Sequence, residues 1–214
     1  MITLETTIRL LGICLVAYLL GSINFAIIIS RLVSRDDIRK HGSGNAGMTN
    51  MLRTYGKWPA ICTALGDFSK AVAAVLIARA FEGGLTEIVP DMGYIAGICA
   101  ILGHMFPLYF RFKGGKGVMA GLGVIAAVNP PIFFILLINV IPMIIISRII
   151  SLASISGAVL FMTLTSIWGF LYTDTPWYYC VCSFIIGGFV IFVHRENIKR
   201  LMAGTENRLG RKKA

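Results

Sequence analysis

Charged residues are scarce in this chain of 214 residues. Asp, Glu, Lys and Arg make up 14% of the sequence, whereas a soluble domain usually carries about 25%. Hydrophobic residues make up 57%, and the mean hydropathy is +0.79. The few charges cannot cover a water-facing surface, which excludes an ordinary soluble enzyme, a disordered regulator and a disulfide scaffold. We expect residues 1–214 to form a single integral membrane domain.

Cysteine and aspartate are too few and too scattered for a disulfide framework or a metal site. The five cysteines are an odd number, and each lies in or beside an apolar stretch without the spacing of a zinc site. A metal-dependent phosphotransferase needs clustered aspartates, which this chain lacks. We therefore predict that the protein uses no metal and no cofactor. The scattered aspartates are Asp36, Asp37, Asp67, Asp91 and Asp174.

The chain carries seven apolar segments, and a helix needs about 20 apolar residues to cross a bilayer. The first segment is too long for the hydrophobic core of a signal peptide, so we expect it to remain as a span. The pattern predicts an all-α polytopic bundle of about seven transmembrane helices. Five is the alternative if the fourth and fifth do not fully cross. The expected spans are 8–30, 58–81, 92–110, 113–128, 131–147, 151–172 and 177–193.

The basic residues give the orientation. The net charge is +10, and most of the 20 Lys and Arg residues fall on one side if segment 31–57 and the C-terminal tail share that side. Cytoplasmic loops carry an excess of Lys and Arg. We therefore place the N-terminus outside and the C-terminus in the cytoplasm. This distribution explains the net positive charge without a nucleic-acid partner.

The first of three polar segments on that side is residues 41–57. Glycine allows close backbone approach, so successive N–H groups can converge on an anion. We expect Thr49 to enter a short helix that carries Arg53. A flexible loop is the alternative, although it would not need such a density of Asn, Arg and Lys. The candidate site residues are Gly42, Ser43, Gly44, Asn45, Thr49, Asn50 and Arg53.

The second polar segment, residues 103–117, ends in a run that resembles a phosphate cradle: Gly114, Gly115, Lys116 and Gly117. It is not a Walker A loop, because Gly117 stands where Ser or Thr should be. Backbone N–H groups and a lysine point charge can still bind a phosphate. His104, near a span end, is either a structural hydrogen-bonding group or part of the site.

The third polar segment, residues 194–206, directly follows the last span. If it is helical, His194 and Asn197 share one face. A basic helix attracted to anionic lipid is the alternative, but it does not explain these two residues. Asp67 and Lys70 also share a helical face, inside the second span. Charged residues inside a bilayer are energetically costly and therefore suggest a functional role. Both an ion pair and a substrate contact remain open for these two residues.

Five sequence motifs together resemble one family, the bacterial acyl-phosphate:glycerol-3-phosphate acyltransferases of the PlsY type. They are Gly21-Ser22-Ile23, GSGNAGMTNMLRTYGK (42–57), GHMFPLYFRFKGGKGVMAGLG (103–123), SLASI (151–155) and HRENIKRLMAGTEN (194–207). The resemblance spans nearly the whole chain. It implies a seven-span inner-membrane enzyme with cytoplasmic motifs. Such enzymes make 1-acyl-glycerol 3-phosphate from an acyl phosphate, in the first membrane step of bacterial phospholipid synthesis.

The resemblance also implies site residues and partners. By position, the catalytic residues are Ser43, Arg53, Lys116, Ser154, His194 and Asn197. The implied partners are acyl phosphate, glycerol 3-phosphate, membrane lipid and the soluble acyl-phosphate synthase. The chain departs from the family pattern mostly at packing positions, namely Asn24, Ala26, Met48 and Ala71.

Two other classes of membrane protein fit the sequence less well. The common glycerolipid acyltransferases use a His-x4-Asp dyad, but the residues five after the three histidines are Ala46, Tyr109 and Lys199. A transporter of an anionic solute would also use glycine-rich segments and intramembrane charges. The polar residues concentrate on one face, however, and no inverted repeat is evident. These observations favour the enzyme.

Overall fold

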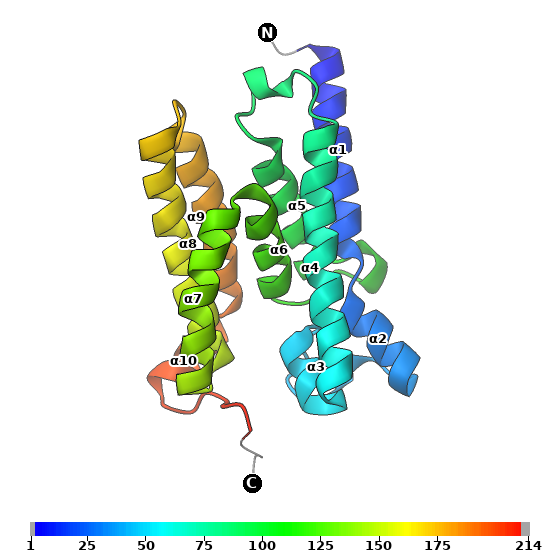
Figure 1. The fold of residues 1–214 in the computed structure, drawn as a ribbon. Helices are drawn as coiled ribbons and strands as arrows, with labels where there is room; N and C mark the ends of the chain where they lie inside the picture. The colour runs from blue at the N-terminus through cyan, green and yellow to red at the C-terminus, as the bar shows by residue number, and fades with distance from the viewer. Residues whose placement is uncertain (1–2, 211–214) are drawn as a thin grey trace. The chain divides into compact units, whose positions relative to one another are not determined.

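The computed structural model describes residues 3–210, and the regular elements in that range are all helices (Figure 1). The predicted all-α class is therefore confirmed. Three short 3₁₀ turns, η1 (Ile38–Lys40), η2 (Leu85–Glu87) and η3 (Leu108–Phe110), lie between longer elements. The α-helices are α1 (Leu4–Ser22), α2 (Phe25–Ser34), α3 (Met48–Tyr55), α4 (Lys57–Ala80), α5 (Met92–Met105), α6 (Val118–Val128), α7 (Pro130–Ser147), α8 (Ile150–Tyr172), α9 (Pro176–Val193) and α10 (Arg195–Met202).

Within residues 3–210, six helical segments are long and apolar enough to cross a membrane: Leu4–Ser34, Lys57–Ala80, Met92–Phe110, Pro130–Ser147, Ile150–Tyr172 and Pro176–Val193. The expected fourth span, 113–128, is helical only over the 11 residues of α6. At 1.5 Å per residue α6 is about 16 Å long, shorter than a hydrocarbon core of about 30 Å. The count of seven spans and the orientation of the termini remain predictions.

The expected span 8–30 lies within the candidate span Leu4–Ser34, but this segment is broken into two helices. α1 ends at Ser22 and α2 begins at Phe25, with Ile23 in an extended conformation between them. The side chain of Asn24 caps α2 by accepting a hydrogen bond from the Ile27 amide at 3.1 Å. A buried polar residue in an apolar run therefore breaks the helix, as N-capping residues do.

Contacts divide the chain into two compact units, Met1–Val128 (unit 1) and Asn129–Ala214 (unit 2). In unit 1, α1 packs on α4 and α5, and α4 packs on α6. Small residues allow these helices to approach closely, as is usual in membranes. A β-carbon at Gly21 would collide with the backbone of Ala100, and one at Gly123 would collide with the Phe68 carbonyl. The core here contains Ile13, Ala17, Ala74, Ala78, Leu85, Met92, Ala96 and Ala100.

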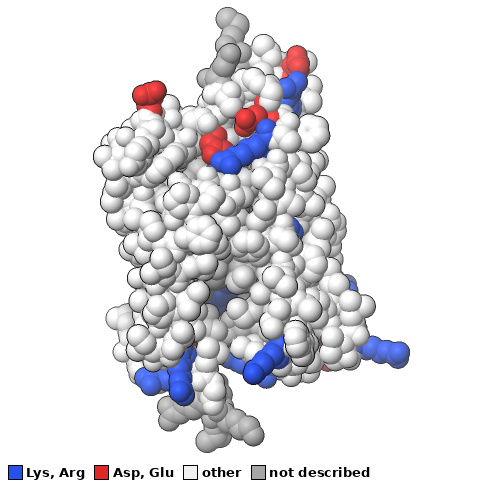
Figure 2. Space-filling view, viewed as in Figure 1, with Lys and Arg blue, Asp and Glu red and all other residues white. Residues whose placement is uncertain are grey.

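The charged ends of unit 1 differ. Figure 2 shows Lys and Arg side chains at the end where α2 and α3 lie, and acidic side chains mixed with basic ones at the opposite end, where α1 begins. At that opposite end, Arg79 pairs with Asp91 at 2.6 Å and donates to the carbonyl of Ala127 at 2.8 Å. The guanidinium therefore satisfies an open carbonyl at the end of α6.

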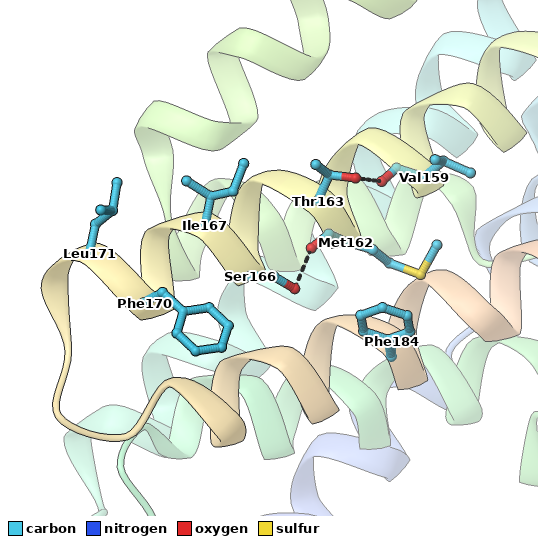
Figure 3. A pocket seen from close by; sticks show the side chains of 8 residues that line it. All are labelled: Val159, Met162, Thr163, Ser166, Ile167, Phe170, Leu171 and Phe184. Carbon is cyan, nitrogen blue, oxygen red and sulfur yellow. Dashed lines mark hydrogen bonds between the residues drawn. The ribbon is translucent and has the colours of Figure 1, made fainter.

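In unit 2, α8 packs against both α7 and α9. A cavity of about 590 Å³ is lined by α8 residues and by Phe184 of α9 (Figure 3). Its two hydroxyl groups, on Thr163 and Ser166, donate to the Val159 and Met162 carbonyls of their own helix. The cavity is therefore apolar, and none of the predicted site residues lines it.

Candidate active site

The first glycine-rich segment folds around the side chain of Asn50. This side chain is buried; its Oδ1 accepts from the Ser43 amide at 3.0 Å, and its Nδ2 donates to the carbonyls of His41 and Ile38 at 2.9 and 3.2 Å. A β-carbon at Gly42 would collide with Asn50 Oδ1, and Gly42 has a φ of +58° that favours glycine. Asn50, predicted to bind phosphate, instead shapes the loop that presents Ser43.

α3 follows this loop and carries Arg53, which confirms the predicted short helix. The Arg53 side chain is exposed, as are Ser43 and Gly44, while Asn45 and Thr49 are half-buried. The exposed guanidinium is able to bind an anion in two hydrogen bonds. The loop and α3 therefore present a cation and a hydroxyl to the surroundings.

Arg39 joins the two glycine-rich segments. Its Nη1 donates to the carbonyls of Phe110 and Lys113 at 2.8 and 2.9 Å, and its Nη2 donates to Asp37 Oδ2 at 2.7 Å. The hydrogen bonds from Arg39 hold the pKa of the Asp37 carboxyl below its usual value. Next to it, the hydrogen bond with His41 lowers the pKa of Asp36, with help from the Asp37 amide and Lys40. The charges of Arg39, Asp36 and Asp37 therefore have structural partners.

The second glycine-rich segment turns back onto the end of α5. The amides of Gly114 and Gly115 donate to the carbonyls of Met105 and His104, both at 3.1 Å. These two amides are therefore not directed at an anion, which corrects the predicted phosphate cradle. A β-carbon at Gly115 would collide with His104 Nε2 and with the Ala46 carbonyl. Gly115 thus lies between His104 and the first loop, and half-buried Lys116 follows it.

Of the two roles left open for Asp67 and Lys70, the structure shows the ion pair, at 2.8 Å with both side chains buried. His104 joins it from α5, with Nδ1 at 3.1 Å from Lys70 Nζ and 3.4 Å from Asp67 Oδ1. Lys70 also donates to the Ile23 carbonyl at the break between α1 and α2. An ammonium group has three donors, and here they match three acceptors. His104 is therefore part of a buried cluster and not at a phosphate-binding surface.

Unit 2 holds the predicted histidine at the junction of α9 and α10. His194 is buried, and its Nδ1 lies 2.7 Å from the Val190 carbonyl oxygen. Because a carbonyl only accepts hydrogen bonds, Nδ1 carries the proton, and in the neutral ring Nε2 carries the lone pair. This tautomer is the one that a general base needs at Nε2.

Glu206 is the centre of a polar cluster in unit 2. Its Oε1 accepts from Asn197 Nδ2 at 2.8 Å and Ser151 Oγ at 3.0 Å, and its Oε2 accepts from Arg200 Nε at 2.7 Å. Burial raises the pKa of this carboxyl, but the three hydrogen bonds outweigh burial and lower it. Sequence reasoning missed this role, because the donors lie up to 55 positions away in the sequence. Ser154 donates to the Ile150 carbonyl of its own helix at 2.9 Å.

The predicted site residues therefore fall into two groups. Unit 1 holds the two glycine-rich segments with Ser43, Arg53 and Lys116, and unit 2 holds Ser154, His194 and Asn197.

Residues 11–204 match the family model described as glycerol-3-phosphate acyltransferase. The chain belongs to the glycerol-3-phosphate acyltransferase family.

Individual relatives support this membership. Glycerol-3-phosphate acyltransferase of Shouchella clausii is 41% identical over 213 residues, which cover 97% of this chain and 99% of the relative. The protein of that name from Clostridioides difficile is 41% identical over 205 residues, 94% of this chain and 96% of the relative. Both share far more than one motif with this chain.

Two solved structures have the same fold. One is a crystal structure of PlsY, an integral membrane glycerol 3-phosphate acyltransferase, in its glycerol 3-phosphate form. It is 36% identical, has a TM-score of 0.83, and the match covers 94% of this chain and 96% of that one. The other is the lysophosphatidic acid form, at 35% identity and a TM-score of 0.79, over 94% and 95% of the two chains.

Proposed function

We propose that this protein transfers a fatty acyl group from acyl phosphate to the primary hydroxyl of sn-glycerol 3-phosphate. The products are 1-acyl-glycerol 3-phosphate (lysophosphatidic acid) and phosphate. The observation that carries the proposal is the likeness, over 94% of the chain, to structures in glycerol 3-phosphate and lysophosphatidic acid forms. The motif resemblance and the broken Walker signature favour a donor that is already activated.

Arg53 and Lys116 bind the phosphate groups in this proposal. Arg53 is exposed on α3, and Lys116 follows a glycine pair whose backbone is fixed by α5. A guanidinium binds phosphate in two parallel hydrogen bonds, and an ammonium acts as a point charge. Thr49 lies one turn before Arg53 on α3, and Ser43, Gly44 and Asn45 lie in the loop that precedes this helix. With Gly117, which follows Lys116, these residues complete the proposed phosphate-binding surroundings.

The chemical step is direct transfer without an acyl-enzyme. The hydroxyl oxygen of glycerol 3-phosphate attacks the acyl carbon, an ester C–O bond forms, and the C–O bond to phosphate breaks. Phosphate leaves with the electron pair, and the hydroxyl proton passes to a base. Because a mixed anhydride has a good leaving group, the protein mainly positions two anions and neutralises charge.

Two groups qualify as the base. His194 has the required tautomer, with Nδ1–H on the Val190 carbonyl and the lone pair on Nε2. A phosphate oxygen of the substrate is the alternative, with His194, Asn197 and Ser154 as orienting groups. The effect of removing His194 on kcat and KM separates these two mechanisms.

The location of the reaction belongs to the same proposal. The protein is placed in the bacterial inner membrane with its active site facing the cytoplasm, where a soluble acyl-phosphate synthase supplies the donor. The gathering of Lys and Arg at the α2–α3 end of unit 1 supports this orientation. The transporter alternative loses its main support, since the charges of Asp67 and Lys70 satisfy each other.

The test uses purified protein in detergent or vesicles with glycerol 3-phosphate and an acyl phosphate, and acyl-CoA in a parallel reaction. We expect 1-acyl-glycerol 3-phosphate and phosphate from the acyl phosphate reaction only. Product from acyl-CoA alone would contradict the proposed donor. Flux of glycerol 3-phosphate across sealed vesicles without acylation would favour the transporter.

A further inference from the structure

Three ionisable side chains are buried together in unit 1, and the reaction proposed above does not use them. Asp67 and Lys70 come from α4 and His104 from α5, and each is at most 5% exposed. Burying charged groups is unfavourable, and apolar residues of similar volume often stabilise a fold as well or better. Stability alone therefore does not explain this cluster, and its connections show what else it does.

The first connection runs from Lys70 to the loop that holds Ser43. Lys70 Nζ donates to the Ile23 carbonyl, at the break between α1 and α2. The next residue, Asn24, caps α2 and donates from Nδ2 to the Ala46 carbonyl at 3.4 Å. The Lys70 ammonium group therefore fixes the backbone at Ile23, and the adjacent Asn24 holds the first glycine-rich loop at Ala46.

The second connection runs from His104 to the segment that carries Lys116. The Gly115 amide donates to the His104 carbonyl, and His104 Nε2 lies against the Gly115 α-carbon, where no β-carbon has room. Because Lys70 donates to Nδ1, the neutral ring carries its proton on Nε2. The ring is thus held by Lys70 on one side and supports Gly115 with its other nitrogen.

We infer that the Asp67–Lys70–His104 cluster is a positioning device that fixes both glycine-rich segments and, through Gly115, sets the place of Lys116 for binding the phosphate of glycerol 3-phosphate. The three residues are positioning residues, because they act through the loop backbone and not by touching the substrate. The inference rests on the proposed function, since it assigns Lys116 to that phosphate. A displacement of about 1 Å at a binding group is enough to lower activity by on the order of a hundredfold.

Two substitutions of His104 separate positioning from stability. In H104N the amide oxygen takes the place of Nδ1 and still accepts from Lys70, but nothing remains at the position of Nε2 against Gly115. In H104Q the amide nitrogen takes the place of Nε2, while the acceptor for Lys70 is lost. We expect H104N to weaken glycerol 3-phosphate affinity by on the order of tenfold to a hundredfold with a small change in Tm. We expect H104Q to lower Tm more and affinity less.

A matched control lies at the other end of α4, where Arg79 and Asp91 form a second ion pair at 2.6 Å. D91N weakens this pair without touching either glycine-rich segment. It should lower Tm and leave the affinity for glycerol 3-phosphate unchanged. A loss of affinity in D91N as large as in H104N would show a general effect of destabilisation and would overturn the inference.

The measurements are thermal unfolding and direct binding of glycerol 3-phosphate by calorimetry, without any acyl donor. Unchanged affinity in H104N, or a loss of affinity in both His104 variants that simply follows Tm, overturns the inference. Wild-type turnover is measured separately with acyl phosphate. Wild-type binding without that turnover would count against the proposed donor only, and the comparison of His104 variants would still decide the positioning role.

Discussion

The two units present different kinds of polar chemistry. In unit 1 the proposed site consists of cations next to glycine-rich backbone, with Arg53 exposed and Lys116 half-buried. In unit 2 it includes a buried histidine and Asn197, which donates to the Glu206 carboxylate together with Ser151 and the charged Arg200. The loops of unit 1 are fixed by backbone hydrogen bonds and by Asn50, whereas the end of unit 2 is fixed by one acidic side chain.

This difference suggests a division of tasks between the units. A cation on α3 and another on a fixed loop are able to neutralise phosphate, so unit 1 is suited to hold two anionic substrates. A histidine with a defined tautomer is suited to accept a proton or to orient a hydroxyl group, and this group is in unit 2. Variants in unit 1 should therefore change KM most, and variants in unit 2 should change kcat or stability.

The largest effect is expected for His194→Ala in unit 2. If His194 is the general base, kcat falls by about 10²–10⁴, the range typical of such a loss. Steady-state kinetics with both substrates measure it, with Arg195→Ala, at the adjacent and exposed first residue of α10, as the matched control. A change mainly in KM would instead identify the substrate phosphate as the base. It would also contradict the assignment of proton transfer to unit 2.

The next largest effect is expected for Arg53→Ala in unit 1. Loss of hydrogen bonds to a charged group, each contributing about 1.5–3 kcal/mol, should raise the KM for glycerol 3-phosphate by about tenfold or more. Arg35→Asn is a suitable control, because Arg35 is an exposed arginine of unit 1 with a φ of +54° that Asn tolerates. Unchanged KM in a folded Arg53→Ala protein would remove Arg53 from the phosphate site.

A smaller effect, on stability, is expected for Glu206→Gln. The substitution keeps the shape of the side chain but removes the negative charge next to Arg200. We therefore expect the free energy of unfolding to fall by about 1–3 kcal/mol, as measured by thermal or denaturant unfolding. Glu196→Gln is the control, because the Glu196–Lys199 pair is exposed, with a separation of 3.1 Å, and such pairs contribute little. Equal losses in the two variants would contradict a central role for Glu206.

The Glu206 carboxyl should also make the stability of the fold depend on pH. Its pKa is lowered in the folded protein from a usual value of 4.5. The stabilisation is therefore complete above that value and is lost as the pH falls through the folded pKa. Unfolding of the wild type should become easier below about pH 4.5, and Glu206→Gln should reduce this acid sensitivity. An identical pH profile in the variant would rule out Glu206 as its source.

No effect is expected from removal of divalent cations. The proposed step uses an activated donor and protein cations for phosphate, so neither unit needs a metal or ATP. Turnover of acyl phosphate should survive excess EDTA without added nucleotide. A loss of activity that Mg²⁺ restores would show that the cations of unit 1 do not suffice.

The helical elements were largely predictable, and the side-chain networks were not. The apolar run of α8 and the short helix that carries Arg53 follow from local pattern. The break at Asn24 was missed because its signal is a single polar residue in an apolar run, and its cap forms with an amide three residues on. Helical spacing placed Asp67 and Lys70 on one face and left an ion pair and a substrate contact open; the structure shows the ion pair. The addition of His104, 34 residues from Lys70, depends on tertiary packing.

The glycine-rich segment 114–117 illustrates the same limit. Its composition suggests open amides, but Gly114 and Gly115 use theirs on the end of α5. Glu206 was unassigned because its partners come from α8 and α10. Local sequence therefore indicated where polar residues gather, and the long-range partners determined their roles.

The attachment of Gly114 and Gly115 to α5 also has a consequence for hydrogen exchange and for binding entropy. Their amides should exchange slowly with solvent and open together with the helix, because exchange requires loss of the hydrogen bonds to Met105 and His104. A loop that is ordered before the substrate arrives loses little conformational freedom when it binds. In the proposed reaction, Lys116 would therefore meet the phosphate from a backbone that folding has already ordered.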